Sequence, residues 1–253
     1  MTEPKILFMD LENVQHMQYM FHPGNLARKR AAGFCVDLAY ILVFGYKWLG
    51  QPAQYLLPDM KQFRRIPHDH DEIDRSICAK ALEIINSADM VVTWYGSGHD
   101  WGFLTGRSMK HGMVLAPNII HLDLYKVASK QMNVSSNRLD NIAKILGCEM
   151  KTKVSNILWP RCWMGDKEAL SEMAEYCAQD VNVLEQVYLK MRPLIKNHPH
   201  IGAISHGDKS LCRTCGSGHY RENGTYALTS GTLYKRLKCL DCQSSFKGWR
   251  IDK

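Results

Sequence analysis

The sequence contains no long hydrophobic run, no internal repeat and no low-complexity tract. Its longest apolar runs, such as residues 41–44, fall far short of the roughly 20 residues that a membrane-spanning helix needs. The opening residues, Met-Thr-Glu-Pro-Lys, lack the apolar region of a secretory signal and lead directly into a strand-like segment. From these absences we expect a protein that is not embedded in a membrane, is not exported and resides in the cytoplasm.

The 253 residues are 45% hydrophobic and 23% charged, which is ordinary usage for a globular chain and excludes a disordered or fibrous protein. The net charge of +7 is unevenly distributed. Residues 203–253 carry nine Lys and Arg against four Asp and Glu, whereas residues 1–202 carry 23 against 21. A basic C-terminal segment on a nearly neutral body favours an anionic partner, most simply nucleic acid. A solvated basic surface explains the charge equally well.

Apolar runs alternate with segments of helical periodicity along the first 201 residues. The runs predict strands at residues 5–9, 38–44, 55–57, 90–94 and 119–124, with Gly45 ending the second. Helices are predicted at residues 71–87, from residue 100 onward, and at 139–146 and 166–195. This alternation is typical of α/β domains. We therefore predict an α/β domain over residues 1–201, a linker over 202–208 and a small appended domain over 209–253.

Asp10 and Glu12 stand at the end of the opening strand-like segment. Strand side chains alternate, so these two carboxylates point to the same face, where their mutual repulsion is costly unless a cation lies between them. Hard divalent cations prefer oxygen ligands of this kind. A surface strand that carries two acids is the alternative interpretation.

Two further positions carry an acid whose side chain we expect the local structure to hold in place. Asp100 follows a break containing two glycines and is followed closely by apolar residues, a position that also suits a helix N-cap. Tyr176 and Asp180 are four residues apart in the last predicted helix, so they share one face at the margin of its apolar stripe. An aromatic residue at a domain edge beside a satisfied acid would give the same pattern.

In chain order, the three sites resemble the motifs of the exonuclease superfamily named for its Asp-Glu-Asp-Asp residues, in the branch that carries a tyrosine (DEDDy). Residues 10–13 (DLEN) resemble its first motif, residues 89–104 (DMVVTWYGSGHDWGFL) its second and residues 176–181 (YCAQDV) its third. The connecting segments HLDLYK and RLDNIAKILG are similar as well, so the likeness covers about residues 5–196. It is clearest to bacterial and phage exonucleases related to the proofreading domain of family-B DNA polymerases.

The sequence departs from that family at two positions in the second motif. The family usually has an asparagine before the glycine and a phenylalanine before the aspartate, whereas Tyr95 and His99 stand there in this chain. The acid itself is intact, so the departure concerns the residues that would face a substrate.

The resemblance implies a ribonuclease H-like fold with a mixed sheet flanked by helices, and a metal-dependent 3′–5′ exonuclease that hydrolyses phosphodiester bonds of DNA or RNA. It implies that two Mg²⁺ or Mn²⁺ ions are bound by Asp10, Glu12, Asp100 and Asp180. Tyr176 would orient the attacking water. Single-stranded DNA or RNA 3′ ends and a replication or repair protein would be the partners. A structure-selective endonuclease on the same fold and a non-catalytic nucleic-acid-binding adaptor are the alternatives.

Four of the nine cysteines form two CxxC pairs, Cys212 with Cys215 and Cys239 with Cys242. Two such pairs supply the four thiolates of a tetrahedral structural zinc site, and strand-like segments between them are typical of a zinc ribbon. We therefore predict one structural Zn²⁺ ion in the C-terminal segment. The other five cysteines lie among apolar neighbours and are predicted to be buried.

The predicted ribbon also carries cations and aromatic rings that suit contacts with phosphates and bases. The candidates for nucleic-acid binding are Arg221, Tyr234, Lys235, Arg236, Lys238, Lys247, Trp249 and Arg250. A ribbon that docks only on the catalytic domain or on another protein is the alternative.

Overall fold

A computed structural model describes residues 4–14, 17–19, 34–37, 39–58, 72–150 and 154–251. The strands are β1 (Ile6–Asn13), β2 (Met17–Tyr19), β3 (Phe34–Asp37), β4 (Ile41–Trp48), β5 (Gln54–Leu56), β6 (Met90–Thr93), β7 (His121–Asp123), β8 (Tyr220–Ala227), β9 (Leu233–Cys239) and β10 (Ser245–Arg250). The helices are α1 (Arg75–Asn86), α2 (Asp100–Lys110), α3 (Leu124–Gln131), α4 (Leu139–Leu146), α5 (Leu158–Trp163), α6 (Lys167–Met191) and α7 (Ile201–His206), with a 3₁₀ turn η2 (Arg192–Leu194). Among the described residues, no helix has both the length and the hydropathy that crossing a bilayer requires.

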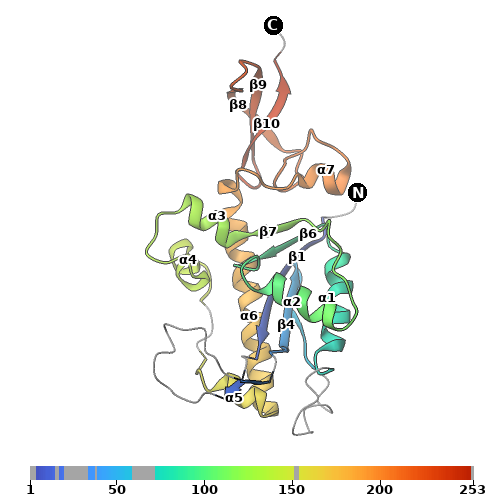
Figure 1. Ribbon diagram of the computed structural model, residues 1–253. Coiled ribbons are helices and arrows are strands. Elements are labelled where there is room, and N and C mark those ends of the chain that lie inside the picture. Colours follow the sequence, from blue (N-terminus) through green and yellow to red (C-terminus); the bar gives the residue numbers. More distant parts are fainter. Residues whose placement is uncertain are drawn as a thin grey trace.

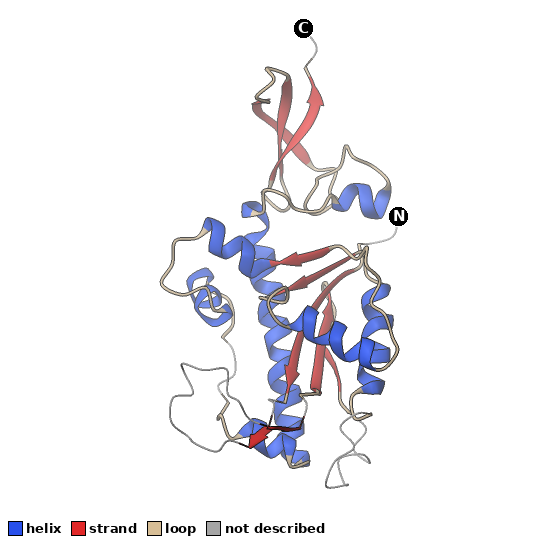
Figure 2. Cartoon of the chain, in the orientation of Figure 1, coloured by secondary structure: helices blue, strands red, loops and turns tan. Residues whose placement is uncertain are grey.

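Five strands form a mixed sheet in the order β5-β4-β1-β6-β7. The opening strand β1 lies at its centre, antiparallel to β4 and parallel to β6, and β6 is parallel to β7. All of β6 and the first four residues of β1 are buried, because both strands are covered on both faces of the sheet. Figure 2 shows the helices on either side of these strands. The structure confirms the predicted α/β fold with a mixed sheet flanked by helices.

Helix α6 packs on one face of the sheet, and α1 and α2 pack on the other (Figure 1). Alternate side chains of β1 separate into these two layers. Phe8 lies in the cluster with α6 side chains, whereas Leu7 and Met9 lie in the cluster with those of α1 and α2. Because the alternation continues along the strand, Asp10 and Glu12 point to the same layer as α6.

The limits of helix α6 follow from its sequence. Asp166 caps its N-terminus as predicted, because its carboxylate accepts a hydrogen bond of 3.0 Å from the backbone N–H of Ala169. The helix was predicted to continue to residue 195 but ends at Met191, where η2 begins. Pro193 lies in that turn, and its lack of a backbone N–H is incompatible with a further helical hydrogen bond.

Gly45 does not end the second strand, which corrects the sequence prediction. It lies inside β4, opposite Asp10 of β1. A Cβ atom at this position would lie 2.6 Å from the Sγ atom of Cys177 in α6 and 3.1 Å from the carbonyl oxygen of the same residue. Glycine is needed here because α6 approaches the sheet this closely, so the residue marks helix packing rather than a strand end.

The C-terminal segment forms its own antiparallel sheet, in the order β10-β9-β8. It lies beyond the C-terminal end of α6 (Figure 1). The range 202–208, predicted as an aperiodic linker, is instead mostly helix α7. This short helix is capped by His200, whose Nδ1 accepts a hydrogen bond from Ala203, and ends at Gly207 with φ +66°. The caps, rather than an apolar periodicity, define this helix, so the sequence pattern did not indicate it.

Candidate active site and metal-binding clusters

Three of the four predicted metal-binding carboxylates lie together where β1 meets α6. One oxygen each from Asp10, Glu12 and Asp180 lies within 4.8 Å of the others. The two strand residues share a face, and Asp180 is a buried residue of α6. Glycine at position 45 of the neighbouring strand lets α6 approach closely enough to complete the group.

The fourth acid, Asp100, lies outside that group of three. It is the first residue of α2 and is 7% exposed. Its Oδ1 atom lies 2.9 Å from Nδ1 of His99. This hydrogen bond, with smaller effects from the charges of Asp100 and Glu12, raises the pKa of His99. The hydrogen bond therefore ties Asp100 to His99 at the start of α2.

Asp123 organises the turn that leads to Asp100. Its carboxylate accepts hydrogen bonds from the backbone N–H groups of Tyr95 (3.0 Å), Ser97 (3.1 Å) and Tyr125 (3.1 Å). Within this turn Tyr95 has φ +66°, a left-handed conformation that is uncommon for a bulky residue and that asparagine adopts more readily. The family's usual asparagine would therefore fit the backbone at this position better than the tyrosine present.

Trp159 of α5 holds Glu12 in place, a contact that the sequence analysis missed. Its indole Nε1 donates a hydrogen bond of 3.2 Å to Oε2 of Glu12. Its ring also meets that of Tyr176 edge-on, with centroids 6.3 Å apart. The contact with Glu12 spans 147 positions in the chain, and no motif around Trp159 indicated it.

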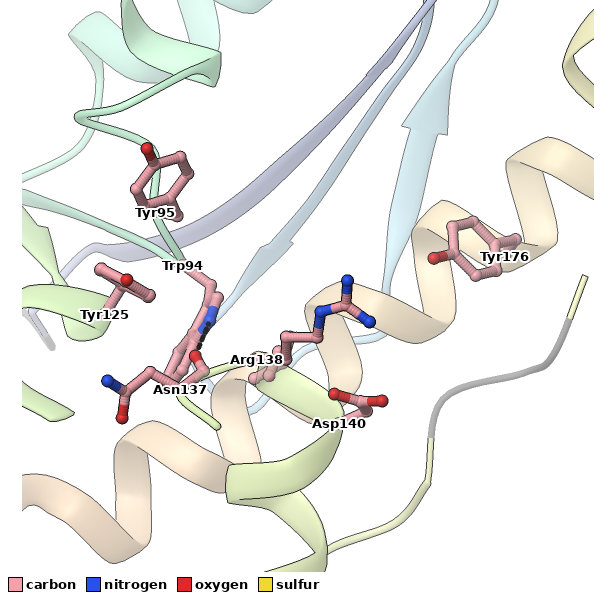
Figure 3. Close-up of a pocket in the computed structure, with 8 residues that line it drawn as sticks. Trp94, Tyr95, Tyr125, Asn137, Arg138, Asp140 and Tyr176 are labelled. Atoms are coloured by element: carbon pink, nitrogen blue, oxygen red, sulfur yellow. Dashed lines mark hydrogen bonds between the residues drawn. The ribbon is translucent and has the colours of Figure 1, made fainter. Parts of the chain in front are cut away.

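A cavity of about 520 Å³ opens beside Tyr176. Trp94, Tyr95 and Tyr125 line it from the second motif and α3, and Arg138 lines it from the start of α4. Figure 3 shows Arg138 and Tyr176 directed toward one another across this space. The rings of Tyr95 and Tyr125 meet at 4.8 Å between centroids. The pocket therefore combines aromatic faces with one exposed cation, Arg138, and one exposed acid, Asp140.

Cys177 is a residue of α6 that lies against the three-carboxylate group. Its Sγ–H donates to the backbone oxygen of Asp10 at 3.6 Å and to Oδ2 of the same residue at 3.7 Å. Burial, together with the nearby carboxylate charges, raises the pKa of the Cys177 thiol well above its usual value. It remains a neutral donor to Asp10, which agrees with the predicted burial of this cysteine.

The four cysteines of the two CxxC pairs converge, with their Sγ atoms all within 4.8 Å of one another. The Cys212–Cys242 and Cys215–Cys239 Sγ atoms are each 3.6 Å apart. Hydrogen bonds from Cys212 and Cys215 hold the pKa of Cys242 below its usual value, whereas contacts with Cys212 and Cys242 raise that of Cys215. One thiolate is thus stabilised by protonated neighbours, and ionising all four requires a cation.

The donor atoms of the two clusters suit different metals. Carboxylate oxygens near β1 are hard ligands of the kind that Mg²⁺ and Mn²⁺ prefer. Four thiolates at tetrahedral spacing are the ligand set of a structural zinc site. The residues present therefore fit the two kinds of ion that the sequence predicts.

The predicted nucleic-acid-binding residues of the ribbon differ in their surroundings. Lys235 pairs with Glu222 at 2.7 Å, which neutralises its charge. Arg236 donates from Nε to the backbone oxygen of Asn223 at 2.8 Å, and Nζ of Lys247 lies 4.3 Å from the ring centroid of Tyr234. Arg221 and Lys238 are opposite each other on β8 and β9, and Trp249 and Arg250 are exposed on β10.

The buried His198 joins this ribbon to α6. Its Nε2 atom lies 2.9 Å from the hydroxyl of Tyr188, and its Nδ1 atom lies 2.7 Å from the carbonyl oxygen of Pro199. Nδ1–H therefore donates to the carbonyl, and Nε2 accepts from the tyrosine. Arg213 of the ribbon donates to the backbone oxygen of His198. Burial lowers the pKa of His198 to about 4, which keeps the ring neutral.

The mixed sheet and its flanking helices define the class of this protein. A family model described as RNase_H superfamily matches residues 43–192, and the chain belongs to that superfamily. The chain is 29% identical over 115 residues to the DNA polymerase catalytic subunit of Gallid herpesvirus 2, covering 46% of this chain and 9% of that protein. It is 25% identical over 105 residues to the corresponding subunit of Equine herpesvirus 1, covering 42% of this chain and 8% of that one.

A solved structure agrees with this assignment. The family B DNA polymerase from the archaeon Pyrobaculum calidifontis aligns with a TM-score of 0.52 at 13% identity, covering 93% of this chain and 32% of that one. The predicted likeness to family-B DNA polymerases is confirmed at the level of the fold. The chain spans about a tenth of the two viral polymerases and about a third of the archaeal one.

Proposed function

We propose that the protein is a metal-dependent 3′–5′ exonuclease that hydrolyses phosphodiester bonds of single-stranded DNA or RNA. The observation that carries this proposal is the convergence of Asp10 and Glu12 of β1 with Asp180 of α6, about one helical turn from Tyr176, which lines the pocket with aromatic walls. Such a group of carboxylates repels phosphate unless cations are bound, so it serves a binding module poorly and a metal-dependent hydrolase well. The superfamily and the likeness to DNA polymerases support the same class of reaction.

In this proposal Asp10, Glu12 and Asp180, with Asp100 at the start of α2, hold two Mg²⁺ or Mn²⁺ ions. Bound in this way, the ions would stabilise the attacking and leaving oxygens of an in-line displacement at phosphorus. Trp159 fixes the orientation of Glu12 through its indole N–H. Cys177 supports Asp10 from the helix side as a neutral donor.

The pocket would hold the terminal nucleotide next to these acids. The rings of Trp94, Tyr95 and Tyr125 offer faces on which a base can stack, worth about 1–3 kcal/mol per base in single-strand binding. Arg138 would contact a phosphate, and the hydroxyl of Tyr176 would orient the attacking water. The zinc-bound ribbon, residues 209–253, would add nucleic-acid contacts outside the active site.

The experiment is digestion of 5′-labelled single-stranded DNA and RNA with Mg²⁺ or Mn²⁺, using the wild-type chain and the Asp10→Ala and Asp100→Ala variants. A ladder that shortens from the 3′ end and disappears in both variants is expected. Glu175→Ala, an exposed acid on α6 outside the cluster, is the matched control and retains activity. Cleavage of a circular single strand would indicate an endonuclease instead, and full activity in either aspartate variant would refute the site.

A further inference from the structure

A basic groove lies where the ribbon meets the end of α6, away from the acidic site. It has a volume of about 410 Å³, and four of the residues that line it are cations: Lys196, Arg213, Arg236 and Lys247. Lys196 belongs to the segment after η2, whereas the other three belong to the ribbon. No aspartate or glutamate is among the described residues that line this groove.

The contacts of these cations leave their charge available. Arg213 and Arg236 donate from Nε to backbone carbonyl oxygens, of His198 and Asn223 respectively. Lys247 rests on the ring of Tyr234, with Nζ 4.3 Å from the centroid. All three partners are neutral, unlike Glu222, which neutralises Lys235 on the same sheet. The contacts position the cations without neutralising their charge, so the groove attracts anions.

The groove also presents aromatic surface. Tyr226 lines it and is 45% exposed, and Phe246 of β10 lines it as well. Aromatic rings interleaved with cations are the combination on which single-stranded nucleic acids bind, because the cations contact phosphates and the rings stack on bases. A small inorganic anion would bind through the cations alone and would make no use of the aromatic rings.

A second depression continues from the same lysine toward α3. It has a volume of about 420 Å³ and is lined by Lys126 and Lys130 of α3 together with Lys196. Of the described residues that line it, one is an acid, Asp123, and its carboxylate accepts hydrogen bonds from the turn before α2. Tyr125, the residue before Lys126, lines the pocket at the candidate active site. Helix α3 therefore borders both the acidic site and the basic depressions.

We infer that the two depressions around Lys196 form one binding track for the phosphodiester backbone of a single nucleic-acid strand, which leads from the ribbon past α3 toward the acidic site. The inference rests on the proposed function and names the path of its substrate. It places the strand in the groove between ribbon and body, and not on the face of the ribbon that carries Arg221 and Lys238.

The test measures binding of 5′-fluorescein-labelled oligothymidylate and oligouridylate to the zinc-loaded full chain, by anisotropy at several salt concentrations without Mg²⁺ or Mn²⁺. The double variant Lys196→Gln/Lys247→Gln removes one cation from each side of the junction. Each lost phosphate contact should lower the slope of log K against log salt by about 0.7 for a single strand, so the double variant should lose about 1.4. Comparing the two oligonucleotides shows whether the track binds DNA, RNA or both.

The matched control is Lys80→Gln/Lys167→Gln, which removes the same charge from exposed lysines outside the ribbon and both depressions. It should retain the wild-type slope. Hydrolysis of thymidine 5′-(4-nitrophenyl) phosphate, which is too short to reach the groove, should be unchanged in both double variants.

Three results would overturn the track. The two double variants could lower the salt slope equally, the groove variant could leave it unchanged, or the wild type could fail to bind a strand. In the last case the cations would face a protein partner instead. If the groove variant loses its salt slope while the wild type cleaves no strand, the track stands and the proposed exonuclease activity fails.

Discussion

The indole N–H of Trp159 donates a hydrogen bond of 3.2 Å to Oε2 of Glu12, across 147 positions of the chain. Glu12 is one of the three clustered carboxylates, so the bond fixes one oxygen of the proposed metal site. A donor at this distance from a ligand oxygen orients the carboxylate and decides which of its oxygens faces the metal. On the proposed function, Trp159 is therefore a positioning residue.

Replacing Trp159 by phenylalanine keeps the ring contact with Tyr176 but removes the donor. Loss of an outer-shell partner typically costs about 10–100-fold in metal affinity or activity. We predict a comparable rise in the Mg²⁺ concentration needed for half-maximal cleavage, with circular dichroism unchanged. Trp163→Phe, on the same helix and also partly buried, is the control. Identical metal requirements in the two variants would show that the hydrogen bond has no such role.

Tyr95 combines an unfavourable backbone conformation with an exposed ring in the pocket. Tyr95→Asn should therefore raise the unfolding free energy by about 1 kcal/mol, because asparagine tolerates a left-handed φ. It should also raise KM severalfold for a single strand by removing a stacking face, with kcat little changed. Denaturant unfolding and steady-state kinetics measure the two effects. Tyr55→Asn, at an exposed position on β5, should change neither the unfolding free energy nor KM in this way. An unchanged KM in Tyr95→Asn would argue against base stacking on Tyr95.

The elements and the acidic motifs could be predicted because their signals are local. Asp166 stands at a cap position, residues 139–146 have helical periodicity before Gly147, and Asp10 and Glu12 alternate along a strand. Gly45 and Trp159 were misread or missed because their meaning depends on a partner more than a hundred positions away, namely Cys177 for the glycine and Glu12 for the tryptophan. No local pattern encodes which helix face meets which strand position.

The sequence also predicted that four acids form one metal site, whereas in the structure three of them form a close group and the fourth lies outside it. Asp10, Glu12 and Asp180 cluster, and Asp100 instead pairs with His99 at the start of α2. The motif order predicts which residues form the proposed site, but it does not indicate how closely each approaches the others. Asp123 was predicted to have a structural role only, and it holds the turn before Asp100, but its three backbone donors come from two segments and could not be identified from the local sequence.

The ribbon should depend on zinc for its fold. Among its described residues, the buried apolar cluster consists of Cys212, Leu237, Cys239 and Phe246, and two of these are the proposed ligands themselves. Metal binding then supplies most of the folding free energy of the segment. Cys239→Ser should reduce bound zinc from one ion per chain to none and make residues 209–253 sensitive to protease. Cys148→Ser, a half-buried cysteine outside the cluster, should keep its zinc. Full zinc content in Cys239→Ser would contradict the site.

The junction between ribbon and body should weaken in acid. The pKa of His198 is about 4 in the folded chain, against about 6.5 when unfolded, so the unfolded state binds the extra proton between these values. Stability therefore falls as pH drops from about 6.5 to about 4, by at most about 3 kcal/mol. The ring faces Tyr188 of α6, Arg192 of η2, and Arg213 and Cys242 of the ribbon, and the two arginines also oppose its protonation.

Urea unfolding at neutral and mildly acidic pH measures this effect, with His198→Gln as the comparison. The glutamine keeps an amide donor and acceptor but cannot titrate. The zinc cluster, which has an acid sensitivity of its own, is retained in the variant. The wild type should lose more stability on acidification than the variant. Parallel losses would assign the pH dependence to the cysteines or to other groups.

The central claim is that the carboxylates at the junction of β1 and α6 form a divalent-metal centre, and Mn²⁺ binding to the zinc-loaded full chain tests it without any choice of substrate. Calorimetric titration should show Mn²⁺ binding that Mg²⁺ competes away. Affinity should fall by at least tenfold in Asp10→Asn and remain at the wild-type level in Glu175→Gln on the same helix as Asp180. Undiminished Mn²⁺ affinity in Asp10→Asn would contradict the account.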